Sequence, residues 1–453
     1  RSLARSILFD VYPTVEKLDG SIDARKRIVE NALKYLDGLS KEASGNMELQ
    51  MELAEAYRKI GDVQGNNKYP NLGDLKGSSE SYKKAVGLIR EVYRSDPKDV
   101  GVKSKLAEAL EEEAFVLWWM GDNPNTYKKY KEAISLYEDL IESDSNSEER
   151  KFALANLYLF YGDVPFWENK IDQAGEIYEK AHQELKRITE KNAEDSEKKA
   201  KYAYSFGRLA KIDISKGRLN EAEKKLEISE KIAQKLVDEN PKSTAFRETL
   251  WGIQFSKCEM YLVNKNTSEA VTACPKIIKT QKKMVEIEPN NNTAIYNLAI
   301  SHSYLGRAYR LAKVYDRALL SFDESIKNLN IILKESPKNI GYRQERIIAI
   351  HSKAGLYEKR GNLREAQRVF EQVADSYKKL LEEVPNEPRS TLNLFKTNAD
   401  LGKNLLAQNK LPEAKTILEE SLKQGNILLK EKALGEFDKK MLERVKSNLS
   451  ELE

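Results

Sequence analysis

One spacing constrains this chain more than any other feature: small residues recur every 48 positions along most of its length. They are Ser78, Thr126, Ala174, Ala222, Ala270, Ala318, Ala366 and Ala414. A second series, four residues later, is mostly large and apolar or aromatic: Tyr82, Tyr130, Tyr178, Leu226, Cys274, Phe322, Phe370 and Leu418. Prolines hold a third place in several copies, at Pro97, Pro241, Pro289, Pro337 and Pro385. Three series that keep step over so many copies predict a chain built from one repeating unit.

The best-defined copy, residues 304–337, reads as two helices closed by a proline. Gly306 on the first helix lets the second come close, and Ala318 is the small residue that meets it. Tyr309 and Phe322 fill the space on either side. This pattern resembles the tetratricopeptide (TPR) repeat, whose usual length is about 34 residues. The longer unit here predicts a second helix that continues for about three to four further turns.

The TPR resemblance implies an all-α fold, namely a right-handed superhelical solenoid of about eight helix-turn-helix repeats with a 48-residue period. Each repeat of a solenoid buries its face against its neighbours, so a chain of 453 residues can form one elongated domain. We expect residues 1–48 to supply N-terminal capping helices that include a half repeat. Residues 49–435 form the solenoid, and residues 436–453 form a C-terminal capping helix. A loop about five residues longer than the others is expected in the first repeat, between Gly61 and Ser78.

Composition and motifs narrow the classes of function that the chain can have. Charged residues make up 33% of the chain, but the net charge is only +4, so no global field favours nucleic acid. No apolar run approaches the roughly 18 residues that a membrane span needs. The motifs HExxH, CxxC and GxSxG do not occur. The sequence therefore favours a protein that is not an enzyme and that has no cofactor, metal or catalytic residues.

TPR proteins bind protein or peptide partners along a concave groove lined by first-helix residues. Projecting the repeat predicts an N-terminal set of groove residues and a C-terminal basic set. They are Glu108, Glu111, Phe115, Trp118, Trp119, Asp163, Phe166 and Trp167, and then Arg307, Arg310, Lys396 and Lys403. The expected partner has apolar anchors and basic residues at one end and acidic residues at the other. The alternative is that the tryptophans only pack between neighbouring helix pairs. RNA binding is disfavoured because the aromatic and basic residues are not interleaved.

Residues 53–86 carry a second resemblance, LAEAYRKIGDVQGNNKYPNLGDLKGSSESYKKAV. They are similar to the opening repeat of the TPR region found C-terminal to bacterial membrane-anchored serine/threonine kinases. Asn67 and Lys68 stand where that family usually has Pro and Tyr. The resemblance implies the non-catalytic sensor or docking half of such a kinase, because no HRD or DFG motif is present. It would be tethered through a part that precedes Arg1, and so be periplasmic. The alternative is a free-standing scaffold or adaptor of an envelope or secretion complex, which would be cytoplasmic if it is not attached to the membrane.

Cys258 and Cys274 take the places of Gly306 and Phe322 in the repeat, where two residues face each other across one helix pair. They are either two buried thiols that behave as small apolar residues or a disulfide, which an extracytoplasmic location would permit. Pro275, next in sequence, predicts a kink or a late start in the second helix of that repeat.

Overall fold

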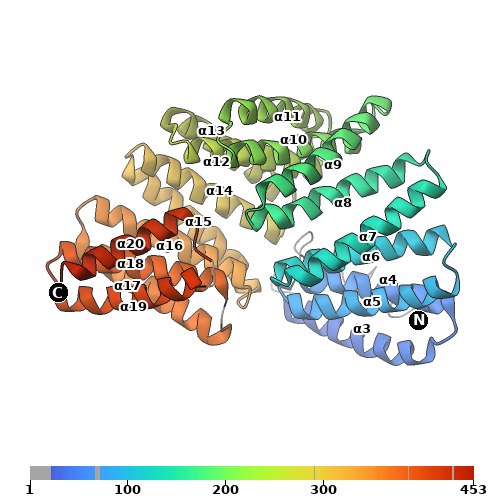
Figure 1. The fold of residues 1–453 in the computed structure, drawn as a ribbon, viewed down its shortest axis with the longest axis horizontal. Helices are drawn as coiled ribbons and strands as arrows, with labels where there is room; N and C mark the ends of the chain where they lie inside the picture. The colour runs from blue at the N-terminus through green and yellow to red at the C-terminus, as the bar shows by residue number, and fades with distance from the viewer. Residues whose placement is uncertain (1–21, 67–71, 290, 386, 431–432, 453) are drawn as a thin grey trace. The chain divides into compact units, whose positions relative to one another are not determined.

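The computed structural model describes residues 22–66, 72–289, 291–385, 387–430 and 433–452. Within these residues the chain is all-α, and eighteen helices follow one another as sequential helix-turn-helix pairs (Figure 1). This confirms the predicted TPR-like fold class. The helix expected within residues 1–18 lies outside the described residues.

Eight helix pairs make up the repeats. The first helices of the pairs are α4 (Met47–Gly65), α6 (Val100–Trp119), α8 (Glu148–Trp167), α10 (Ser196–Ser215), α12 (Thr244–Val263), α14 (Asn292–Leu311), α16 (Ile340–Lys359) and α18 (Pro388–Ala407). The second helices are α5 (Leu75–Ser95), α7 (Asn123–Ser143), α9 (Ile171–Lys191), α11 (Leu219–Glu239), α13 (Thr267–Ile287), α15 (Tyr315–Glu335), α17 (Leu363–Glu383) and α19 (Leu411–Lys430). Helix α3 (Ile22–Glu42) precedes the pairs, and α20 (Glu436–Ser450) follows them.

The helix boundaries repeat with the predicted period. Among the second helices of the pairs, from α5 to α19, each begins 48 residues after the preceding second helix. The same spacing separates the first helices of the pairs from α6 to α18. The exception is the step from α4 to α6, which is 53 residues. The five additional residues lie between the end of α4 and the start of α5, where the longer loop is expected, and residues 67–71 of this segment lie outside the described residues.

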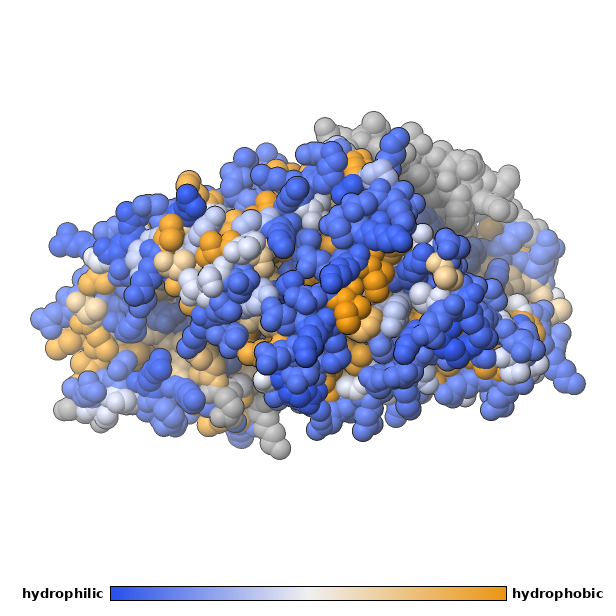
Figure 2. Space-filling view, turned by 90° about the horizontal axis from the view of Figure 1, so that it is seen from above, coloured by the Kyte–Doolittle hydropathy of each residue, from blue (hydrophilic) through white to orange (hydrophobic). Residues whose placement is uncertain are grey.

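The helices pack into two compact units. The first holds the described residues up to Asn264 together with Lys276–Ile295, and the second holds Lys265–Pro275 and the described residues from Tyr296 onward. In the first unit, α4 packs on α5, α6 on α7, α8 on α9 and α10 on α11; in the second, α16 packs on α17 and α18 on α19. Each second helix in these runs also packs on the first helix that follows it, as α5 does on α6. Hydrophilic residues cover most of the face seen in Figure 2, as the high content of charged residues requires.

A small residue on the first helix faces a large one on the second, as the sequence predicts. A Cβ atom added to Gly306 would lie 2.8 Å from the ring of Phe322, and one added to Gly162 would lie 2.5 Å from the ring of Tyr178. These distances are shorter than any ordinary Cβ contact, so only glycine allows the two helices to pack this closely. Ala114 and Ala354 take the same place in other repeats, and both are fully buried.

We expect Gly306→Ala to lower the free energy of unfolding by about 1–2 kcal/mol, because the added methyl group must displace the buried ring of Phe322. Gly355→Ala is the matched control, since a Cβ at Gly355 meets nothing within 4 Å. There alanine should stabilise α16 by about 0.5–1 kcal/mol through its better helix propensity. Urea unfolding followed by circular dichroism measures both, and equal shifts of the same sign would contradict the close packing.

The turn inside each repeat uses one residue in the left-handed region, a regularity that the sequence analysis missed. Gly73, Gly121, Gly217 and Gly361 have positive φ angles between 74° and 80°. The same place is held by Asn169, Lys265, Lys313 and Asn409, with φ between 54° and 61°. At Gly121 the turn closes as a helix cap, because the Asp122 amide donates to the carbonyl of Leu117 at 3.0 Å. The corresponding bond is present in five further repeats, for example from the Val314 amide to the carbonyl of Tyr309, whereas in the first repeat the Asp74 amide donates to the carbonyl of Gln64 instead.

Of the two outcomes expected at Pro275, a kink or a late helix start, the late start is wrong. Helix α13 begins at Thr267, in the same register as the other second helices, and is helical without a break to Ile287. Helix α8 likewise contains Pro165 near its C-terminal end. Each proline removes one backbone donor from its helix, and the remaining bonds and packing keep both helices continuous.

Candidate partner-binding site

The two units divide the predicted groove residues between them. The first unit contains the N-terminal set from Glu108 to Trp167, and the second contains Arg307, Arg310, Lys396 and Lys403. The N-terminal set comes from the first helices α6 and α8, as the projection predicted.

The aromatic side chains of α6 and α8 form a connected cluster. The ring centroid of Phe115 lies 6.1 Å from that of Trp118, 6.4 Å from that of Trp119 and 5.9 Å from that of Phe160 on α8. Phe115 is buried and Trp118 is partly buried against the core of the first unit. Trp119 is 49% exposed, so this end of the cluster reaches solvent.

Trp167 repeats the position of Trp119 exactly one period later, and it is 67% exposed. Each tryptophan is the last residue of its first helix. The ring of Trp167 contacts Phe166, with centroids 5.8 Å apart, and Phe166 packs against the core between α8, α9 and α10. Because these two tryptophans are exposed, the solenoid does not need them for its core.

Asp163 is part of the fold rather than an open groove carboxylate. Its side chain is only 7% exposed, accepts a hydrogen bond from the hydroxyl of Tyr178 at 2.5 Å, and forms an ion pair with Arg208 at 2.7 Å. Arg208 comes from α10, the first helix of the next repeat, and its guanidinium also lies over the ring of Tyr204. This buried pair links neighbouring repeats. The sequence analysis identified Asp163 but missed Arg208.

The repeat position that Asp163 occupies holds a different residue in the second repeat than in the first and third. In the first repeat Asp62 accepts a hydrogen bond from Tyr82 at 2.5 Å, and burial raises the pKa of Asp62 to about 6. In the third repeat Asp163 accepts a hydrogen bond from the hydroxyl of Tyr178 in the same way. In the second repeat Phe115 stands at this position, and the fully buried hydroxyl of Tyr130 has no hydrogen-bond partner among the described residues.

Removing the two hydroxyls should therefore have different effects on stability. We expect Tyr178→Phe to lower the free energy of unfolding by about 1–3 kcal/mol, because Asp163 loses a buried hydrogen bond. Tyr130→Phe removes an unpartnered buried group, so it should be neutral or stabilising by up to about 1 kcal/mol. The two residues lie one period apart and are both fully buried. Urea unfolding of the two variants measures the difference, and equal losses would contradict the pairing.

An arginine surrounded by carboxylates lies beside the aromatic cluster. The guanidinium of Arg58 on α4 makes two hydrogen bonds of 2.8 Å to Glu112 on α6. It also lies 3.2 Å from Glu55 and 3.3 Å from Glu108. Burial raises the pKa of Glu108, as do the charges of Glu112 and Glu55, although Arg58 opposes the shift. We call these four residues the Arg58 cluster; three carboxylates surround one cation, so the cluster carries excess negative charge.

Most of the predicted basic residues of the second unit interact with other residues of that unit, through ion pairs or an aromatic ring. Lys396 forms an ion pair with Asp438 on α20 at 2.9 Å, and Lys403 pairs with Glu358 on α16 at 3.1 Å. The guanidinium of Arg307 lies 4.5 Å from the ring centroid of Tyr304. Partial desolvation of the Arg310 guanidinium by its neighbours, together with the nearby charge of Arg307, lowers the pKa of Arg310. The basic set is therefore less available to a partner than the tryptophans are.

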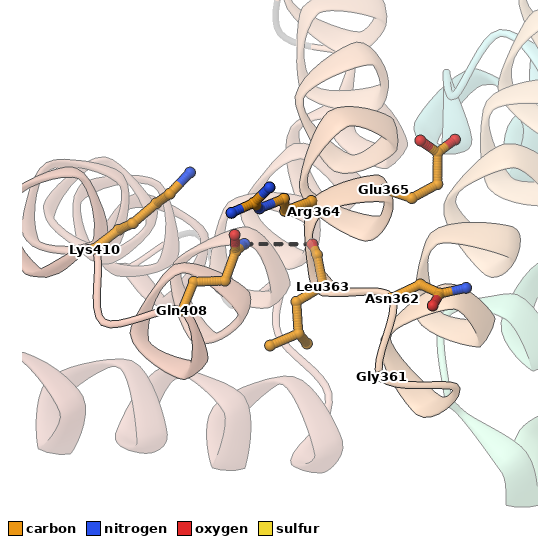
Figure 3. A pocket seen from close by; sticks show the side chains of 7 residues that line it. All are labelled: Gly361, Asn362, Leu363, Arg364, Glu365, Gln408 and Lys410. Carbon is orange, nitrogen blue, oxygen red and sulfur yellow. Dashed lines mark hydrogen bonds between the residues drawn. The ribbon is translucent and has the colours of Figure 1, made fainter.

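A hollow of about 590 Å³ lies on the second unit (Figure 3). It is formed by the turn before α17 and the turn before α19. Gln408 donates a hydrogen bond to the carbonyl of Leu363 across it at 3.3 Å (Figure 3). Its lining residues are Gly361, Asn362, Leu363, Arg364, Glu365, Gln408 and Lys410. Most of the lining side chains are charged or carry amides, and Leu363 is the only large apolar side chain among them.

Both cysteines are fully buried, and neither is a free thiol in the structure. A Cys258–Cys274 disulfide in the isolated protein stays a prediction. We expect iodoacetamide to modify the unfolded protein only after reduction, as followed by mass spectrometry. Alkylation of both thiols without reductant, in protein purified from its native compartment, would contradict the bond.

Within the described part of the chain, no helix combines the length and the apolar character that crossing a membrane requires. No protein-family model and no curated protein matches the chain. Solved structures similar to it include BtubC (BKLC) from P. vanneervenii, at 17% identity and a TM-score of 0.41, over 57% of this chain and 92% of that one.

Two further likenesses cover more of the chain. A signal transduction ATPase (STAND) protein with a tetratricopeptide repeat sensor from Pyrococcus horikoshii shares 16% identity, with a TM-score of 0.48, over 83% of this chain and 53% of that one. A Rap protein complexed with Competence and Sporulation Factor shares 14% identity, with a TM-score of 0.43, over 91% of this chain and all of that one. The chain's own repeats, with their 48-residue period and small-to-large contacts, make it a TPR-like solenoid of the kind used for protein–protein interaction.

Proposed function

We propose that the chain is a non-catalytic protein-interaction solenoid that holds a segment of a partner protein against the first helices α6 and α8. One observation carries the proposal: Trp119 and Trp167 are exposed at the same repeat position in consecutive repeats. Tryptophan is enriched among residues that dominate binding energy at protein interfaces.

The finer proposal is that the chain is the sensor or docking region of a bacterial membrane-anchored signalling kinase. It is supported by the similarity of residues 53–86 to the opening repeat of that family's TPR region. Under this proposal the chain is periplasmic and tethered through a preceding membrane helix. The second candidate is a free-standing scaffold of an envelope or secretion complex. Determining the coding sequence upstream of Arg1 separates them: a membrane helix after a kinase domain supports the first, and its absence contradicts the first.

The interaction itself is tested with a defined probe. The immobilised chain is used to select random dodecapeptides displayed on phage, and the enriched peptides are synthesised and titrated by calorimetry. We expect a common motif and binding of one peptide to one chain. If repeated selections enrich no motif and no synthetic peptide binds, the proposed function is wrong for short partner segments.

A further inference from the structure

The Arg58 cluster and the aromatic cluster lie along one face of α6. Glu108, Glu112, Phe115 and Trp119 are separated by four, three and four residues. In an α-helix, residues at these spacings share one face. We call this face the α6 stripe. It is acidic at its N-terminal end, aromatic at its C-terminal end, and exposed at both, since Glu108 and Trp119 are each about half exposed.

The stripe departs from the polar pairing of the neighbouring repeats. Phe115 takes the position of a carboxylate that pairs with a tyrosine in the first and third repeats. The departure leaves the buried hydroxyl of Tyr130 without a partner among the described residues. An unsatisfied buried polar group costs about 1–3 kcal/mol. Such local violations of folding rules are expected at functional sites, and this one involves Phe115, the buried residue whose ring lies 6.4 Å from that of the exposed Trp119.

The electrostatics of the acidic end indicate what charge it would bind. Glu55 and Glu108 are 49% and 48% exposed, whereas Arg58 is 14% exposed and already engaged by Glu112. A cation brought from solvent would reduce the repulsion among the three carboxylates, whereas an anion would increase it. The Arg58 cluster therefore complements an arginine or lysine side chain.

We propose that the α6 stripe binds a partner segment in which an arginine or lysine lies on the Arg58 cluster and an aromatic or aliphatic residue lies on Trp119 and Trp167. The proposal rests on the proposed function and specifies the partner's chemistry. Glu108 and Trp119 are eleven residues apart, or about 16 Å along the helix axis. An extended peptide covers this distance in about five residues, which sets the expected spacing between the basic residue and the anchor.

A charge exchange tests the proposal with the selected dodecapeptides as probes. We expect peptides that carry a basic residue about five positions from an apolar one. Glu108→Lys should weaken their binding at least about tenfold, which corresponds to about 1.4 kcal/mol. A peptide in which the basic residue is replaced by glutamate should bind the Glu108→Lys variant better than it binds the unmodified chain. Glu142→Lys makes the same charge change at an exposed position of the second helix α7 and should have little effect.

The outcomes separate this inference from the proposed function. Selected peptides without basic residues, or equal binding by the Glu108→Lys and Glu142→Lys variants, would overturn the inference while leaving the interaction function in place. If peptides bind neither the unmodified chain nor either variant, the proposed function fails first. Circular dichroism of each variant should show unchanged helix content, because both glutamates are exposed.

Discussion

Replacing Arg208 with alanine is expected to lower the free energy of unfolding by about 3 kcal/mol or more. The side chains of Arg208 and Asp163 are 15% and 7% exposed, so the change leaves a carboxylate buried without its cation. The hydrogen bond from Tyr178 remains but does not neutralise the charge. Urea unfolding at neutral pH, followed by circular dichroism, measures the loss.

Two further variants control this prediction. Adding Asp163→Asn to Arg208→Ala should recover part of the stability, because a neutral amide can still accept the hydrogen bond from Tyr178. Arg368→Ala removes an arginine from a solvent-exposed ion pair with Glu365 and should have little effect, since such pairs contribute little. If Arg208→Ala is no more destabilising than Arg368→Ala, the Asp163–Arg208 pair does not hold the two repeats together.

Trp119→Ala and Trp167→Ala are expected to weaken binding of a selected peptide by about 2 kcal/mol each. The two side chains are 49% and 67% exposed, so their removal should leave the helical fold intact. Each change deletes a large apolar contact surface at the same place in consecutive repeats. Calorimetric titration of the single and double variants gives the loss.

Val263→Ala is the matched control, because Val263 is the last residue of α12 and is 58% exposed at the same repeat position. It lies two repeats beyond Trp167 and should not affect the peptide. Loss of helix content in the tryptophan variants would mean that these side chains belong to the core. Unchanged affinity in the double variant would mean that the partner binds elsewhere.

The repeat was predictable because it depends on backbone spacing and side-chain size. The spacing between Gly306 and Phe322 recurs from the second repeat onward, with a small residue before a larger one in every copy except the Cys258 and Cys274 pair, and the helix starts follow from that register. The left-handed turn residue also recurs every 48 residues. It was harder to recognise because Lys265 and Lys313 take a place that glycine or asparagine holds in the other repeats.

The polar contacts could not be read from the register in the same way. Asp163 projects to the groove, but its partner Arg208 lies 45 residues away, at a position that Phe160 takes in the preceding repeat. Whether a groove residue is exposed to solvent or forms an ion pair within the fold depends on neighbouring residues that do not recur in every repeat. Lys396 shows the same limit, because its partner Asp438 comes from the terminal helix α20 and from no repeat.

The most direct measurement is a crystal structure of the chain bound to a selected peptide. The account predicts that the peptide lies against Trp119 and Trp167 with its basic side chain beside Glu108. A peptide bound instead along the second helices, or in the polar hollow around Gly361 and Gln408, would contradict it.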